Sequence, residues 1–264
     1  MGEYKGMAEA VRSLLAEPAA VLSQAACRMI AVLIGLCCHE WGHAYVAYRC
    51  GDDTAKRAGR MTLNPLAHLD PVGTILMLFA GFGFAKPVPV NPYRFKGNRI
   101  RCDLFVSLAG ILVNIVLFTV FTYLTLFASM YLWKPEVIQH YGIDVLVSYK
   151  WSPIWSVIDG SVIADYGSLL ARPALAHLVR IAAYTALVNL NLAVFNLIPI
   201  PPLDGYHVAN DILFKGKIQL DARGFRIAML LVLALSAFGV LGRLISFVVY
   251  PAQGLLLLPF GGGL

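Results

Sequence analysis

Long apolar runs separated by short polar loops dominate the pattern of residues along the chain. An α-helix needs about 20 mostly apolar residues to cross the hydrocarbon core of a bilayer. Four runs reach that length, although Arg28 and Arg243 interrupt two of them, and they cover residues 19–48, 104–133, 175–200 and 227–250. We therefore expect an all-α polytopic membrane protein with about four transmembrane helices.

A shorter apolar segment follows the first run, at residues 72–84, and contains Gly73, Gly81 and Gly83. It is too short for a helix that crosses the bilayer. Lys and Arg in short loops mark the cytoplasmic side of a membrane, and both flanks of this segment are basic. A crossing segment would place one flank outside, so we predict a re-entrant or short buried segment.

The same charge rule predicts the sides of the other loops. Residues 215–226 are basic, whereas residues 134–174 carry acidic residues beside their lysines and arginine. We expect residues 134–174 to form an external loop region that lies partly along the interface, because they are too polar to span the bilayer. Residues 1–18 mix charged and small apolar residues, so we expect an interfacial segment and no cleavable signal peptide there. The whole chain, 1–264, is expected to be one integral-membrane domain with external ends.

Composition supports a membrane protein and argues against nucleic-acid binding. Hydrophobic residues make up 59% of the 264 residues and charged residues only 14%, against about 25% charged in soluble domains. The formal charge of +6 comes from basic residues in short loops, without a basic face that would bind nucleic acid. The five cysteines show no Cys-x-x-Cys spacing, so we expect reduced thiols that pack between helices.

The sequence His39-Glu40-Trp41-Gly42-His43 is the strongest candidate for chemistry. Histidines four residues apart lie on one face of a helix and can bind one metal ion. In such motifs the glutamate acts as general base toward a metal-activated water. Ionisable residues in an apolar helix are costly to insert into a membrane, so their presence indicates a functional role. We predict a zinc site at His39 and His43, with Glu40 as the catalytic residue.

A catalytic zinc needs a third protein ligand. Asp204 is the best candidate, because it follows the third crossing on the same side of the membrane as the histidine pair. It belongs to a proline-broken segment, 196–205, of the kind tolerated at membrane depth where it lines a cavity. An N-cap is the alternative role for Asp204, and His207 is the alternative ligand. The weaker candidates are Asp211, His68, His177 and His140, the last of which should lie on the external side.

These motifs resemble the site-2 protease family of intramembrane zinc metalloproteases, peptidase family M50. His39-Glu40-x-x-His43 is similar to the family's zinc helix, and Asn196-x-x-Pro199-x-Pro201-Pro202-Leu203-Asp204-Gly205 to its third-ligand motif. Gly110-x-x-x-Asn114 matches a further family pattern on the intervening helix, although Ile111 stands where many relatives have proline. The segment 86–92 resembles the compact form of the family, without a PDZ or CBS domain.

The resemblance implies a three-helix catalytic core made by the first three crossings, and one Zn²⁺ per chain. It implies cleavage of transmembrane or membrane-associated protein substrates near the cytoplasmic side of a bilayer, here expected to be a bacterial cell membrane. It also implies that Asn196, Asn114 and Pro202 position the substrate. Plain helix packing is the alternative role for Asn114.

Two other functions stay open at this point. The chain could bind metal without proteolysis, as a transporter or a pseudoprotease, although Glu40 and the clustering of candidate ligands at one face favour hydrolysis. It could also hydrolyse a soluble or peripheral peptide. Near the short segment, His68 and Asp70 are expected to belong to a polar turn, with gating or support of the site as the alternatives.

Overall fold

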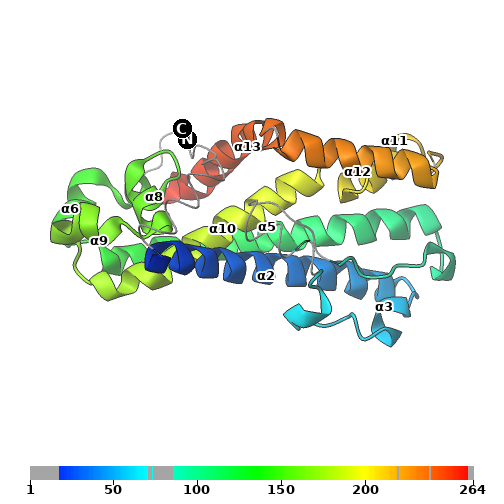
Figure 1. Cartoon of the computed structure of the whole chain (residues 1–264), viewed down its shortest axis with the longest axis horizontal. Helices are drawn as coiled ribbons and strands as arrows, with labels where there is room; N and C mark the ends of the chain where they lie inside the picture. The colour runs from blue at the N-terminus through cyan, green and yellow to red at the C-terminus, as the bar shows by residue number, and fades with distance from the viewer. Residues whose placement is uncertain (1–17, 71–72, 74–85, 219, 238, 261–264) are drawn as a thin grey trace.

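Three long helices form the centre of the computed structural model, which describes residues 18–70, 73, 86–218, 220–237 and 239–260. They are α2 (Pro18–Arg49), α5 (Arg99–Leu132) and α10 (Ala176–Asn196), which pack against one another. Figure 1 shows α2 and α5 running side by side along the length of the molecule. The described residues contain no β-strand, so the all-α prediction is confirmed.

Among the residues that the structure describes, four helices are long and apolar enough to cross a membrane. They span Leu22–Arg49, Arg99–Leu132, Pro173–Asn196 and Val240–Phe260. The chain is therefore an integral membrane protein, and the number of candidate spans in its described part equals the predicted number of crossings.

Small residues let the three central helices approach closely. A Cβ atom on Gly42 of α2 would lie 3.1 Å from the Val113 side chain and 3.3 Å from the Ala109 carbonyl oxygen of α5. A Cβ atom on Gly35 would lie 2.8 Å from Leu192 of α10. Helices in a membrane associate by such close packing, because lipid is as apolar as the side chains that it would replace. The contacts at Gly42 and Gly35 thus hold α2, α5 and α10 together as the predicted three-helix core.

The last apolar run differs from its prediction. The expected crossing at 227–250 is divided between α12 (Ala222–Ala237) and α13 (Val240–Leu257), and the candidate span begins only at Val240. Gly239 lies between the two helices with φ of 71°. An α-helix cannot continue through a left-handed residue, and glycine adopts that conformation without steric penalty.

Residues 134–174 form a packed cap, which we define as α6 (Pro135–Tyr141), α7 (Ile143–Val147), α8 (Ser152–Asp159), α9 (Val162–Tyr166) and the short 3₁₀ turns η3 (Gly167–Leu169) and η4 (Pro173–Leu175). Prolines stand in the first turns of α6, α8 and η4, where the missing N–H has no intrahelical partner to lose. Ile154 and Val157 are almost fully buried in a cluster that includes residues of α10 and α13. The predicted loop region is thus a small folded layer over one end of the bundle (Figure 1).

Short elements surround the opposite end of the bundle. They are α3 (Thr54–Arg57), η1 (Pro65–Ala67), η2 (Pro92–Arg94) and α11 (Asp204–Leu213). Asn64, Asn91 and Asn98 each accept a backbone N–H at the start of the helix or turn that follows. Apart from Gly73, the predicted re-entrant segment 72–84 lies outside the described residues.

Candidate metal centre

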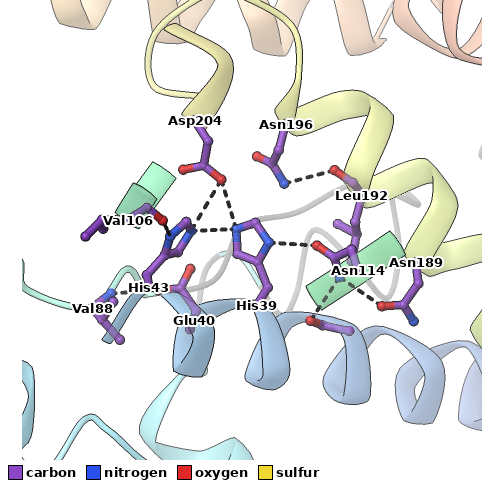
Figure 2. Close-up of polar contacts among 11 residues, drawn as sticks. His39, Glu40, His43, Val88, Val106, Asn114, Asn189, Leu192, Asn196 and Asp204 are labelled. Carbon is purple, nitrogen blue, oxygen red and sulfur yellow. Dashed lines mark hydrogen bonds and ion pairs between the residues drawn. The ribbon is translucent and has the colours of Figure 1, made fainter. Parts of the chain in front are cut away.

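His39 and His43 lie one turn apart on α2 and point toward the same spot between the helices (Figure 2). Both residues are buried, and their Nε2 atoms are 2.9 Å apart. Asp204, the first residue of α11, places Oδ2 at 3.2 Å from His39 Nε2 and 3.3 Å from His43 Nε2. The ligand atoms of these three residues all lie within 4.8 Å of one another.

Hydrogen bonds on the far side of each imidazole fix its tautomer. His43 Nδ1 lies 2.7 Å from the Val106 carbonyl oxygen, which can only accept, so Nδ1 carries the proton. His39 Nδ1 lies 2.7 Å from Asn114 Oδ1. The amide nitrogen of Asn114 donates to the Gly35 carbonyl and to Asn189 Oδ1, so its oxygen faces His39 as an acceptor. With the proton on Nδ1, the neutral form of each imidazole has its free lone pair on Nε2, the atom that lies next to Asp204 Oδ2.

The resulting donor set fits a zinc ion. Two Nε2 lone pairs and a carboxylate oxygen converge, and Asp204 Oδ2 is a buried atom without a hydrogen-bond donor among the described residues. Such lone pairs repel one another unless a cation lies between them. Two imidazoles and one carboxylate are the protein ligands of many catalytic zinc sites, and outer hydrogen bonds to the imidazoles are typical of them.

Gly110 lets α5 lie directly against the two imidazoles. A Cβ atom at this position would lie 2.5 Å from His39 Cε1, 2.6 Å from His43 Nε2 and 2.7 Å from His39 Nδ1. No side chain fits in that space. The Gly-x-x-x-Asn pattern thus places two groups on the same face of α5. The backbone at Gly110 lies against both imidazoles, and the side-chain amide of Asn114 bonds His39.

A tight turn carries Asp204 back to the histidines. α10 ends at Asn196, and α11 begins at Asp204 after a turn that includes a cis bond between Pro201 and Pro202. A Cβ atom on Gly205 would lie 2.3 Å from the Leu197 carbonyl oxygen, so only glycine allows this approach. Leu203 occupies the N-cap position and no side chain caps the helix, so the alternative role of Asp204 as an N-cap is wrong.

Comparison with known proteins agrees with this geometry. Residues 27–239 match the sequence model described as Peptidase family M50, a range that includes His39, His43 and Asp204. The chain belongs to peptidase family M50. A Bacillus subtilis relative named "Putative zinc metalloprotease YwhC" is 36% identical over 208 residues, which cover 77% of this chain and 78% of the relative.

Mycobacterial members of the family match over a shorter region. "Putative zinc metalloprotease Rip2" of Mycolicibacterium smegmatis is 29% identical over 177 residues, 66% of this chain and 52% of the relative. Rip2 of Mycobacterium tuberculosis H37Rv is also 29% identical, over 178 residues and the same shares. The chain spans about half the length of these two relatives, and no solved structure matches it. The M50 chain is a zinc metalloprotease of the site-2 protease type.

Glu40 of this M50 chain lies beside the histidines with its carboxylate turned toward them (Figure 2). It is buried, and its Oε2 accepts the Val88 N–H at 2.7 Å. A carboxylate at this place can exchange a proton with a water molecule near the histidine and aspartate atoms.

The other predicted residues of the M50 site have different surroundings. Asn114 is fully buried and bonds His39, Gly35 and Asn189, which indicates support of the histidine. Figure 2 shows the Asn196 side chain near Asp204, where its amide nitrogen donates to the Leu192 carbonyl at 3.0 Å. Pro202 is exposed in the turn before α11.

The alternative ligands do not join the described cluster. His207 Nδ1 lies 3.3 Å from Asp103 Oδ2, and this contact raises the pKa of His207. Asp211 is buried near the same pair. His68 is buried in the predicted turn, with Nε2 at 2.8 Å from the Thr62 carbonyl. His140 and His177 lie in α6 of the cap and at the beginning of α10.

Sequence reasoning missed three partners of the site. Asn189 carries a signal that could have revealed it, because an amide in the middle of an apolar helix usually has a partner inside the bundle. Val106 and Val88 contribute backbone groups, which any residue type could provide.

Proposed function

We propose that this chain hydrolyses peptide bonds of membrane-embedded or membrane-adjacent proteins at one zinc ion held by His39, His43 and Asp204. The convergence of three ligand atoms beside Glu40, with both imidazole tautomers set by outer hydrogen bonds, is the observation that carries the proposal. Membership of the M50 family and the apolar spans support a substrate that lies in or beside the bilayer.

Each residue has a defined task in the proposed reaction. Zinc bound at this site would supply Lewis acidity toward the attacking water and the scissile carbonyl. Glu40 accepts a proton from the water while the water oxygen attacks the carbonyl carbon of the substrate. Glu40 then gives that proton to the leaving nitrogen as the C–N bond breaks. Asn114 and the Val106 carbonyl hold the imidazoles in place throughout.

Substrate positioning is proposed for Asn196 and Pro202, with Asn114 acting through His39. Asn196 lies near Asp204 and donates to a carbonyl of its own helix, a bond that it can exchange for one to a substrate carbonyl. Pro202 has no N–H and leaves an exposed, rigid turn beside the site. A substrate helix must unwind locally before its carbonyl can be attacked.

Glu40→Gln tests the general-base role. Purified wild type and variant are incubated with a panel of transmembrane peptides, and cleavage and bound zinc are both measured. We expect cleavage to fall by about 10²–10⁴-fold, the usual contribution of a general base, while zinc is retained. Glu136→Gln, an exposed change in α6, is the matched control. Undiminished cleavage by Glu40→Gln would refute the mechanism, and zinc without cleavage in the wild type would favour the non-proteolytic alternative.

We also propose that the chain forms one membrane domain whose zinc site faces the cytoplasm of a bacterial cell. The basic residues near the site and the cap at the other end support this orientation, because positive loops stay cytoplasmic. Alkaline phosphatase fused after Lys150 should be active outside the cell, and the same enzyme fused after Lys217 should be inactive. The reverse pattern would contradict the orientation.

A further inference from the structure

We infer that the extended segment 86–91, here called the strap, positions the Glu40 carboxylate through one backbone amide, that of Val88. The inference rests on the proposed role of Glu40 as general base. It makes Val88 a positioning residue for the reaction, through its N–H group.

The contact between the strap and Glu40 is short and buried. The Val88 nitrogen lies 2.7 Å from Glu40 Oε2, and both residues are only 8% exposed. A buried carboxylate without a donor is strongly unfavourable. Within the described part of the chain, Val88 is the one hydrogen-bond donor recorded for Glu40. The amide therefore determines where this oxygen lies.

The sequence of the strap limits it to one central donor. Pro87 and Pro89 flank Val88, and proline has no backbone N–H. Proline also fixes φ, so alternating prolines hold the segment extended without help from a neighbouring strand. The strap can offer an N–H to Glu40 at Val88 and cannot offer one at either adjacent position.

Contacts at both ends fix the strap independently of Glu40. The Lys86 N–H donates to the His68 carbonyl at 2.9 Å, and Arg60 Nη2 donates to the Lys86 carbonyl at 2.7 Å. At the other end the Asn91 N–H donates to Asp52 Oδ2 at 2.6 Å. The Val88 side chain packs in a small cluster with Ala44 and Ala55. The donor is thus held in place by contacts other than its bond to Glu40.

One consequence concerns the other oxygen of Glu40. Oε2 is engaged by Val88, and no hydrogen bond to Oε1 is recorded from the residues that the structure describes. Glutamate has several rotamers, and a fixed Oε2 restricts them to those that present Oε1 in one direction. A restraint of this kind aids the chemical step more than substrate binding, because proton transfer depends on the position of the base.

Proline substitution at position 88 tests the inference. Val88→Pro removes both the N–H and the valine side chain, whereas Val88→Ala removes only side-chain atoms, so the difference between them measures the amide. We expect kcat of Val88→Pro to fall roughly 10- to 100-fold further than kcat of Val88→Ala, in line with one lost hydrogen bond to a charged group. KM and bound zinc should be similar in the two variants.

Val90→Pro provides a matched control for backbone stiffening in the same strap, and we expect its kcat to fall no further than that of Val88→Ala, because it leaves the Val88 N–H in place. Equal kcat values for Val88→Pro and Val88→Ala would overturn the inference. If Glu40→Gln also cleaves normally, the proposed function fails with it. If Glu40→Gln is inactive while the two Val88 variants are equal, only the role of the strap fails.

Hydrogen exchange gives a readout that does not need an active enzyme. Prolines at 87, 89 and 92 leave few amides in a peptide that covers the strap, so exchange at Val88 can be resolved by mass spectrometry. In Glu40→Ala the Val88 amide should exchange at least about tenfold faster than in wild type, because it loses its acceptor. Asn91, bonded to Asp52, should keep its rate. Unchanged exchange at Val88 would contradict the inference even if Val88→Pro failed to fold.

Discussion

At the scale of single residues, the metal centre depends on how closely α5 approaches the histidines. Gly110 leaves no room for a side chain, and Asn114 one helical turn further holds His39 by its Nδ1. The position of each imidazole is therefore determined from behind by α5, while its Nε2 faces Asp204. A side chain at position 110 would therefore displace the proposed zinc ligands.

Gly110→Ala should weaken zinc binding and cleavage together. The added methyl group would lie 2.5–2.7 Å from atoms of both imidazoles, so the rings must move. We expect zinc affinity to fall by about 10- to 100-fold, as for loss of a supporting contact, with a similar or larger loss of activity. Competition with a zinc chelator measures the affinity.

Gly254→Ala is the control for this prediction, because a Cβ atom there would meet nothing within 4 Å. It should bind zinc as the wild type does. Normal zinc affinity in Gly110→Ala would show that α5 does not restrain the histidines.

Four side chains of the candidate site were predicted from the sequence, whereas the side chain of Asn189 was missed. His39, Glu40, His43 and Asp204 stand out because ionisable groups are costly in apolar segments, and the structure brings His39, His43 and Asp204 together. The contributions of Val106 and Val88 could not be predicted, because every residue type has a backbone carbonyl and all except proline have a backbone N–H.

At the scale of helices, a buried arginine joins the cap to the bundle. Arg180 of α10 is 4% exposed and donates to the Ile158 and Asp159 carbonyls at the end of α8, and also to Ser23 Oγ of α2. These carbonyls lie at the negative end of the α8 dipole, which favours a cation. One side chain thus connects three helices.

Arg180→Met should destabilise the protein without changing the zinc site. Loss of hydrogen bonds from a charged donor typically lowers the free energy of unfolding by about 1.5–3 kcal/mol. Thermal unfolding in detergent micelles should show a lower midpoint, with zinc content unchanged. Arg172→Met, which removes an exposed guanidinium near the Tyr131 ring, should have a much smaller effect. Equal midpoints for the two variants would contradict the role of Arg180.

The contact between α5 and α11 should make stability depend on pH. Burial and the nearby Asp103 carboxylate raise the pKa of Asp211 to about 6, although His207 opposes the shift. The pKa of an unfolded aspartate is about 3.9, so the folded state binds the proton more tightly and loses stability as pH rises from about 4 to 6.

Asp211→Asn should remove this loss, so its midpoint of unfolding should exceed that of the wild type at pH 7.5 and approach it below pH 4. Thermal unfolding in detergent across this pH range measures the effect. Glu136→Gln, at an exposed position, should keep the wild-type dependence. A variant that is less stable than wild type at pH 7.5 would indicate that Asp211 stabilises the fold as a carboxylate.

Helix boundaries were harder to predict than the helices themselves. Apolar length identified the crossings, but the break between α12 and α13 depends on one left-handed glycine inside an apolar run. In the same way, residues 134–174 are too polar to span, yet enough of their apolar side chains are buried to form a folded cap. The mean polarity of a segment predicts whether it can span a bilayer, but it does not predict which short helices pack together.

At the scale of the whole molecule, the two ends are built from different elements. Figure 1 shows the cap with α6, α8 and α9 at one end, and α3 and α11 at the other. The proposed zinc ligands come from α2 and from the beginning of α11, so side chains far apart in the sequence meet only when α2, α5 and α10 are assembled. Formation of the site therefore requires the folded bundle.

X-ray absorption at the zinc K edge of the purified wild-type protein tests the central claim most directly. We predict four nitrogen or oxygen ligands at about 2.0–2.2 Å, with the scattering pattern of two imidazoles, as His39, His43 and a carboxylate from Asp204 would give. A sulfur ligand at about 2.3 Å, or a third imidazole, would contradict the proposed site.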